Sequence, residues 1–166
     1  MTDKKDKPAF VNLTDDDVDS VERRVNKLKN EDIDKVNKIC EQFYHALLGL
    51  IATSRTFTKD DEDLAELDRI KRLLCLIPKF EVFIRVQGRL WHFREKILEC
   101  DMDYFLNLDY SGAIKKDHKA KMIESIIGIV KDKFPKLSKA DQTLFWQKTT
   151  LLLNYTAQFR KIVGNF

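Results

Sequence analysis

With 166 residues, of which 43% are hydrophobic and 34% charged, the chain is long enough to bury the core of one domain and too apolar to be disordered. The 30 basic and 27 acidic residues are interspersed and leave a net charge of only +3, which argues against a general nucleic-acid binder. No apolar run approaches the ~18 residues that a membrane-spanning helix needs, so we expect no membrane span.

The first 13 residues are predicted to form a polar, extended arm. Met1 is followed by Thr-Asp-Lys-Lys-Asp-Lys, which is unlike a secretory signal peptide, so we expect an intracellular location in the cytoplasm or nucleus. Three apolar residues close the arm and are candidates for docking on a partner: Phe10, Val11 and Leu13.

A short helix is predicted over residues 14–29. Thr14 and Asp17 have the spacing of a capping box, with Asp in place of the usual Glu. Four apolar residues follow a 3-4-3 spacing, a narrow seam of the coiled-coil kind: Val18, Val21, Val25 and Leu28. The seam either lies on the protein's own core or binds another chain, and residues 14–29 are therefore a candidate partner-binding helix.

Two further helices are predicted before Pro78. Apolar residues at helical spacing indicate the first from about Glu31 to Thr53, with a turn over 53–57. Thr58 and Asp61 again have capping-box spacing and begin the second, which Pro78 breaks or kinks.

The stretch from Lys79 to Cys100 is apolar on most of its circumference, which indicates a central helix that other helices cover. The alternation of Phe80, Val82, Ile84 and Val86 also permits a β-strand over 80–86. A helix is the better interpretation, because a second strand of similar quality to pair with is missing from the sequence.

The remainder of the chain is also predicted to be helical. We expect one short helical turn within 101–110, a helix over about 113–133 that Pro135 ends, and a last helix that Ser138 caps and Gly164 stops. Leu151 and Leu152 are among the apolar residues of this last helix. The fold class is therefore all-α, with residues 14–166 forming a single bundle of about five or six helices behind the N-terminal arm.

Catalytic and metal-binding patterns are missing from the sequence. The three cysteines lack metal or redox spacing and are expected to be free thiols that act as small buried hydrophobic residues: Cys40, Cys75 and Cys100. The histidines lack zinc spacing, and the glycines form no phosphate loop. We therefore expect no enzyme and no cofactor or metal, the alternative being a site built from distant residues such as His45 with Cys40.

Two basic groups are candidate contacts for acidic protein or phosphate. The first is a stripe on the central helix: Arg85, Arg89, His92 and Lys96. The second stands near the start of the helix over 113–133: Lys115, Lys116, Lys119 and Lys121, beside His118. The alternative for the stripe is an ordinary solvated helix face. Positive charge at a helix N-terminus is disfavoured by the helix dipole, which for the second group suggests an anionic partner.

Two segments of the C-terminal half resemble a known group of proteins. The sequence FLNLDYS at 105–111 precedes a lysine-rich amphipathic helix, and LFWQKTTLLLNYTAQF follows at 144–159. Together they resemble small, mostly uncharacterised all-helical proteins of large DNA viruses of eukaryotes, some of which are virion components. The resemblance implies a structural or assembly role and supplies no catalytic residues.

We therefore expect a non-enzymatic helical structural or interaction protein, a minor component of a larger assembly such as a virus particle. Its partners would be other protein chains, either copies of itself or different ones, and its location intracellular or in the virion. The alternative is a nucleic-acid-associated protein that uses its basic helix faces.

Overall fold

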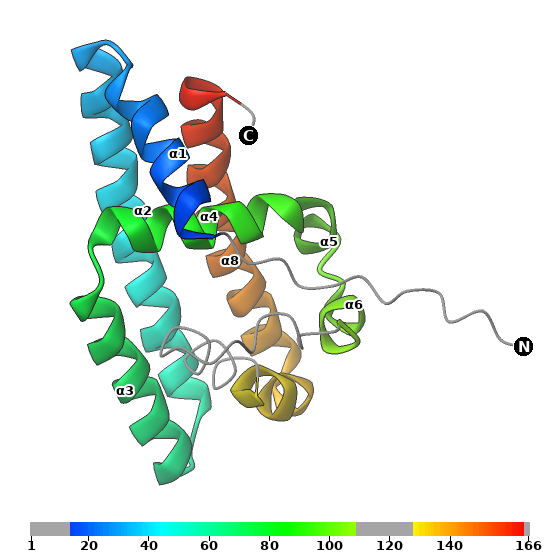
Figure 1. Ribbon diagram of the computed structural model, residues 1–166. Helices are drawn as coiled ribbons and strands as arrows, with labels where there is room; N and C mark the ends of the chain where they lie inside the picture. Colours follow the sequence, from blue (N-terminus) through cyan, green and yellow to red (C-terminus); the bar gives the residue numbers. More distant parts are fainter. Residues whose placement is uncertain (1–13, 109–127, 165–166) are drawn as a thin grey trace, which may run out of the picture.

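The computed structural model describes residues 14–108 and 128–164, and all the regular structure in these two ranges is helical. The predicted all-α class is thus confirmed for this part of the chain. Figure 1 shows the helices, whose bounds are α1 (Asp15–Asn26), α2 (Asn30–Phe57), α3 (Asp61–Leu76), α4 (Lys79–His92), α5 (Arg94–Leu98), α6 (Met102–Leu106), the 3₁₀ turn η2 (Phe134–Lys136) and α8 (Lys139–Val163). Residues 128–133 are also helical and lead into η2.

The two longest helices, α2 and α8, lie side by side, and α4 crosses both of them (Figure 1). At this crossing, three fully buried phenylalanines meet, one from each of α2, α4 and α8. The ring of Phe83 on α4 packs edge-on against Phe43 of α2 at 4.9 Å and against Phe159 of α8 at 4.8 Å between centroids. Such edge-to-face pairs are favourable beyond the area they bury, so this trio marks the centre of the core.

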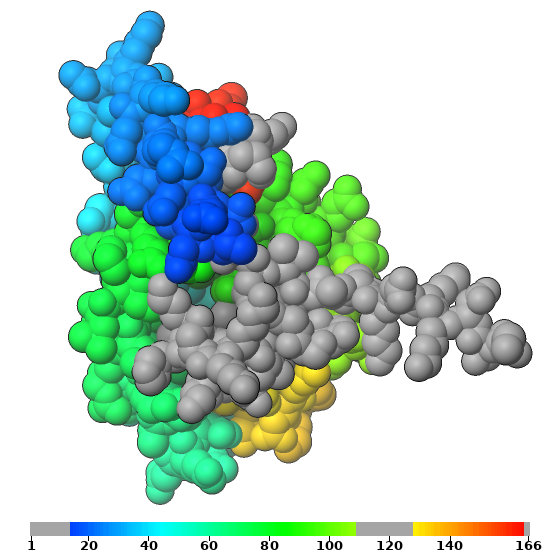
Figure 2. Space-filling view, in the orientation of Figure 1, coloured from blue at the N-terminus to red at the C-terminus, as the bar shows by residue number. Residues whose placement is uncertain are grey.

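Helix α1 packs on this core through the apolar seam. Val18, Val21 and Val25 are each at most 7% exposed and belong to the same cluster as the phenylalanine trio, while Leu28 is partly buried against it. Figure 2 shows the other side of α1, in dark blue, on the surface of this face of the molecule. In this structure the seam therefore packs on the protein's own core, and its side chains form no open surface for another chain.

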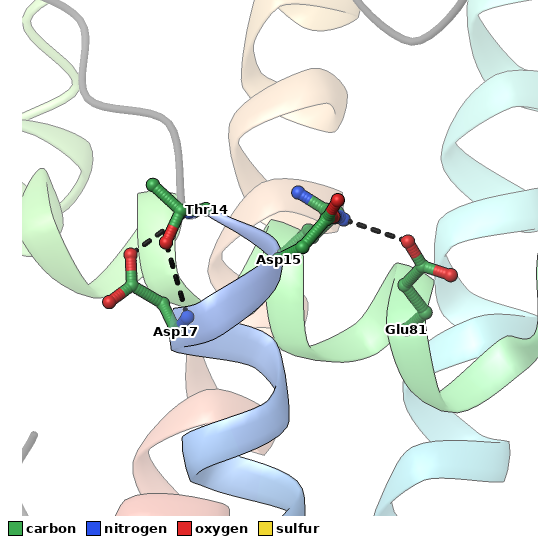
Figure 3. Close-up of polar contacts among 5 residues, drawn as sticks. Thr14, Asp15, Asp17 and Glu81 are labelled. Carbon is green, nitrogen blue, oxygen red and sulfur yellow. Dashed lines mark hydrogen bonds and ion pairs between the residues drawn. The ribbon is translucent and has the colours of Figure 1, made fainter.

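The capping box that opens α1 is present as predicted. The Thr14 hydroxyl accepts from the Asp17 amide at 3.2 Å, and the Asp17 carboxylate accepts from the Thr14 amide at 2.9 Å (Figure 3). Because an unfilled N-cap leaves amide groups of the first turn without an acceptor, Thr14→Ala is expected to lower the free energy of unfolding by about 1 kcal/mol. Urea unfolding at neutral pH measures the change.

The same box makes the contribution of Asp17 depend on pH. The Thr14 amide and then the Thr14 hydroxyl hold the pKa of the Asp17 carboxyl below its ordinary value. The stabilisation is therefore present above the pKa of the unfolded chain and is lost as the pH falls through the lower, folded pKa. The stability difference between the wild type and Asp17→Asn should accordingly shrink on acidification. A difference that stays constant with pH would contradict the carboxylate's role in the cap.

The predicted continuous helix over 79–100 is wrong in one respect. Helix α4 ends at His92, and a separate short helix, α5, begins at Arg94. The buried ring of Phe93 stands between them and packs edge-on against Tyr104 and Phe105 of α6. Tertiary packing of this ring accompanies the break, whereas the nearest glycine, Gly88, lies inside the continuous part of α4. The strand alternative for residues 80–86 is also wrong, because these residues are helical.

Two boundaries around α2 and α3 differ from the prediction. The turn expected over 53–57 is the last part of α2, where the hydroxyls of Ser54 and Thr56 donate to the Leu50 and Thr53 carbonyls. Thr58 does not cap α3, because its hydroxyl donates back to the Ser54 carbonyl at 3.0 Å. Asp60 is the cap instead: its carboxylate accepts from the amide of Glu62.

The C-terminal boundaries are confirmed. Ser138 caps α8 by accepting from the Asp141 amide, and Pro135 lies in the η2 turn that precedes it. Gly164 ends α8 with φ +93°, in the left-handed region where glycine is least strained. The short turn predicted within 101–110 is α6. Most of the helix predicted over 113–133 lies outside the described residues, and its final part, 128–133, is helical.

Candidate partner-binding surface on helix α8

Six of the candidate binding residues lie outside the described parts of the chain: Phe10, Val11, Leu13, Lys115, Lys116 and Lys119. Lys121 and His118 lie outside them as well. Of the remaining candidates, the four seam residues pack in or against the core, with Leu28 only partly buried. The four residues of the basic stripe are covered to different extents, and His92 alone among them is exposed.

Arg85, the first residue of that stripe, bridges two helices. Its guanidinium Nε donates to the Glu81 carboxylate one turn earlier on α4 at 3.1 Å, the contact drawn to Glu81 in Figure 3. A terminal nitrogen pairs with Asp15 at the start of α1. The Arg85 side chain is only 16% exposed. Its charge therefore already serves to fix α1 on α4.

The rest of the stripe does not form one continuous face. Burial, and then the charge of Arg85, lower the pKa of Arg89 to about 10. His92 is exposed at the end of α4. Lys96 lies beyond the break, on α5, where its ammonium group contacts Glu99 at 3.2 Å and Asp101 at 3.6 Å. The structure thus separates Lys96 from the α4 residues and pairs the two ends of the predicted stripe with carboxylates.

A buried polar contact joins α4 to α8. The Arg160 Nε donates to the Gln87 side-chain oxygen at 3.1 Å, and the Gln87 amide nitrogen donates to the Ile84 carbonyl. Burial, and then the nearby charge of Arg94, lower the pKa of Arg160 to about 10. The Arg160 guanidinium also lies 5.1 Å from the centre of the Trp91 ring. Arg160 and Gln87 both lie buried between α4 and α8, which indicates a structural role for this pair.

The cysteines only partly follow the prediction. Cys40 is buried, and burial raises the pKa of its thiol to about 11, so it behaves as a small hydrophobic residue. Cys75 and Cys100 are exposed, which corrects the expectation of burial for both. The Tyr44 hydroxyl donates to the Cys75 sulfur at 3.8 Å. Neither of these two cysteines is part of an apolar periodicity in the sequence. Their exposure therefore depends on the packing of the helices, which the sequence does not display.

Within residues 14–108 and 128–164, no group of three or more histidine, cysteine or acidic side chains is arranged to hold a metal ion. His45 lies exposed beside Glu41, at 3.9 Å from its carboxylate, whereas Cys40 is buried. In the same ranges, no helix is both long enough and apolar enough to cross a membrane.

The outward side of α8 differs in composition from the other outer faces. Five exposed residues lie on it at a 4-4-3-4 spacing, and we call them the α8 stripe: Thr143, Gln147, Leu151, Asn154 and Gln158. This spacing puts them on one face of the helix, over a length of about 22 Å. None of the exposed α8 residues from 143 to 158 is charged, although the chain as a whole is 34% charged. Exposed Lys139 and Lys161 bracket the stripe.

A groove of about 730 Å³ runs along this stripe. Thr143, Gln147, Leu151 and Asn154 line it together with Trp146 and, from the end of α5, the exposed Cys100. Among the described residues that line the groove, Lys139 alone carries a charge. Leu98, two residues before Cys100, is 64% exposed, and Leu151 is 39% exposed. A surface poor in charge that also offers an aromatic ring and exposed leucines has the composition of a protein–protein interface.

The apolar pattern of the sequence did not predict the α8 stripe. Leu151 was expected only as one of the apolar residues of the last helix, and the structure shows this leucine exposed. The signal that would have found the stripe is the repetition of uncharged Thr, Gln and Asn at helical spacing opposite the buried face.

Comparison of the chain with protein-family models, with curated proteins and with solved structures finds no match.

Proposed function

We propose that this chain is a non-enzymatic helical protein that binds other protein chains and serves as a minor structural component of a larger assembly, such as a virus particle. The observation that carries the proposal is the uncharged α8 stripe with its groove. A solvated helix face on so highly charged a chain would be expected to carry lysine and glutamate, which are depleted where protein surfaces meet.

Two features of the sequence support the assembly part of the proposal. The segments at 105–111 and 144–159 resemble small helical proteins of large eukaryotic DNA viruses, and the second of them includes most of the α8 stripe. The N-terminal arm, with Phe10, Val11 and Leu13, would add a second contact to a neighbouring chain. The location would accordingly be intracellular, with the protein also carried in the virion.

The alternative of a nucleic-acid-associated protein has less support. Binding to nucleic acid depends on cations that can replace the counterions of the phosphates. Arg85 and Lys96 are each already paired with two carboxylates, so contact with phosphate would have to displace those pairs.

The test is sedimentation of the full-length protein from the cells that make it naturally. We expect the wild type to sediment with large particles in a density gradient. Leu151→Glu places a charge at the centre of the α8 stripe and should shift the protein to the light fractions. Leu76→Glu is the matched control, because Leu76 is 80% exposed on α3 and does not line the groove.

Several outcomes would count against the proposal. A wild-type protein found only in the light fractions would contradict an assembly role. Equal sedimentation of the wild type and Leu151→Glu would show that the α8 stripe is not the contact. Loss of the large particles after nuclease treatment, together with weakened binding by a variant in which Arg85, Arg89 and Lys96 are replaced by glutamine, would favour the nucleic-acid alternative.

A further inference from the structure

The α8 stripe has an internal symmetry. Thr143 and Gln158 stand at equal distances from its midpoint between Thr150 and Leu151, and so do Gln147 and Asn154. If a second copy of α8 lay antiparallel on the first, with a two-fold axis through this midpoint, each of these four residues would therefore meet another member of the stripe. Thr143 would face Gln158 of the second copy, Gln147 would face its Asn154, and the two Leu151 side chains would meet near the axis.

The chemistry of these residues suits such a pairing. In a two-fold interface the same patch meets itself, so charged residues near the axis would meet like charges. The stripe carries no charge. Carboxamides and hydroxyls both donate and accept hydrogen bonds, so they can pair with one another without a complementary surface. Leucine against leucine would supply apolar contact at the centre.

The shape of the surface also suits a second helix. Thr143, Gln147 and Leu151 form one i, i+4 ridge of α8, and Trp146 and Thr150 belong to the neighbouring ridge. Helices pack by setting a ridge of one into the furrow between two ridges of the other. The groove found here lies along these two ridges and is walled on one side by Cys100.

We propose that the occupant of this groove is a second copy of the chain, joined through antiparallel α8 helices about a two-fold axis near Leu151. The proposal rests on the proposed function and names the partner that the α8 stripe takes. A single helix face is small beside the ~800 Å² that each partner commonly buries in a stable complex, so the dimer should form as the protein concentration rises rather than at every concentration.

The first experiment measures the molar mass of the full chain by light scattering over a wide range of concentration. We expect the mass to rise from 19.6 kDa towards twice that value. The rise should persist at high salt, because the residues of the α8 stripe carry no charge and salt screens the repulsion between the lysines that bracket it. Leu151→Glu should keep the protein at the mass of one chain, whereas Leu76→Glu should dimerise like the wild type. Circular dichroism of both variants shows whether the helices are retained.

The second experiment tests the geometry by disulfide crosslinking. Cys75 and Cys100 are replaced by serine, which leaves only the buried Cys40, and single cysteines are then introduced on the stripe. Leu151→Cys should crosslink with itself on oxidation, because the two side chains meet near the axis. Gln147→Cys should not, since its two copies would lie about 10 Å apart along the direction of the helices, beyond the ~7 Å limit between Cα atoms. A mixture of Gln147→Cys and Asn154→Cys should form the mixed dimer.

Each result decides between alternatives. Crosslinking of Gln147→Cys with itself would overturn the antiparallel arrangement in favour of a parallel one. A wild type that keeps the mass of one chain at all concentrations, with no crosslinking of Leu151→Cys, would overturn the proposal of a second copy. The gradient experiment would still decide the proposed function on its own, because a different protein would then occupy the stripe.

Discussion

Replacing Phe83 with alanine is expected to lower the free energy of unfolding by about 3–5 kcal/mol, the usual cost of deleting a large aromatic side chain from a core. Phe83 is fully buried, and its ring contacts Phe43 and Phe159 from two other helices. The substitution leaves a cavity where α2, α4 and α8 meet, and it removes both edge-to-face ring contacts. Because domains of this size are stable by only ~5–15 kcal/mol, the variant should be marginally folded at room temperature. Urea unfolding followed by circular dichroism measures the loss.

Leu76→Ala provides the comparison. Leu76 is 80% exposed, so its truncation should change the stability by no more than about 0.5 kcal/mol. If Phe83→Ala were equally mild, the phenylalanine trio could not be the centre of the core.

Placing a charge in the α1 seam should have the next largest effect. Val21 is 4% exposed among apolar side chains, so Val21→Asp buries a carboxylate without a partner and is expected to cost about 3 kcal/mol or more. If α1 detached from the core, the carboxylate would reach solvent, and the loss of free energy of unfolding would be smaller. We therefore expect both a lower midpoint of urea unfolding and faster proteolysis within residues 14–29.

Ser20→Asp is the matched control, because Ser20 adjoins Val21 in the sequence and is exposed. It adds the same charge to the same helix without burying it, so its stability should stay close to that of the wild type. The effect of Val21→Asp relative to this control should also shrink at low pH, because a protonated carboxyl group costs less to bury. A fully stable Val21→Asp variant that failed only to bind a partner would restore the seam as an intermolecular surface.

Periodicity and capping signals predicted much of the fold. Capping at Thr14 and Ser138, the break at Pro78 and the stop at Gly164 all follow from local chemistry that the sequence displays directly. The seam in α1 was likewise recognisable as apolar. Its spacing alone could not say whether another helix of the same chain or a different chain would cover it.

The predictions failed where local and tertiary effects compete. Residues 53–57 combine Thr, Ser and Arg and resemble a turn, yet their hydroxyls donate to carbonyls of the preceding turn and the helix continues. The interruption at Phe93 has no local signal, because it accompanies packing against Tyr104 and Phe105. Which side of α8 faces outward depends on α2 and α4, so the apolar pattern alone could not show that Leu151 lies on the exposed side.

The contact between α2 and α8 also affects how the protein folds during its synthesis. Helix α2 belongs to the first third of the chain, whereas α8 is the last helix, and these two make the most extensive contact between helices among the described residues. During synthesis, Phe43 and Phe83 therefore leave the ribosome before Phe159, their third partner, has been translated. The core of a nascent chain therefore stays incomplete until α8 has been synthesised. Forming the contact between these distant segments then carries a loop-closure cost in entropy. Stalled or prematurely terminated chains that lack α8 should consequently be clients of chaperones and proteases rather than stable fragments.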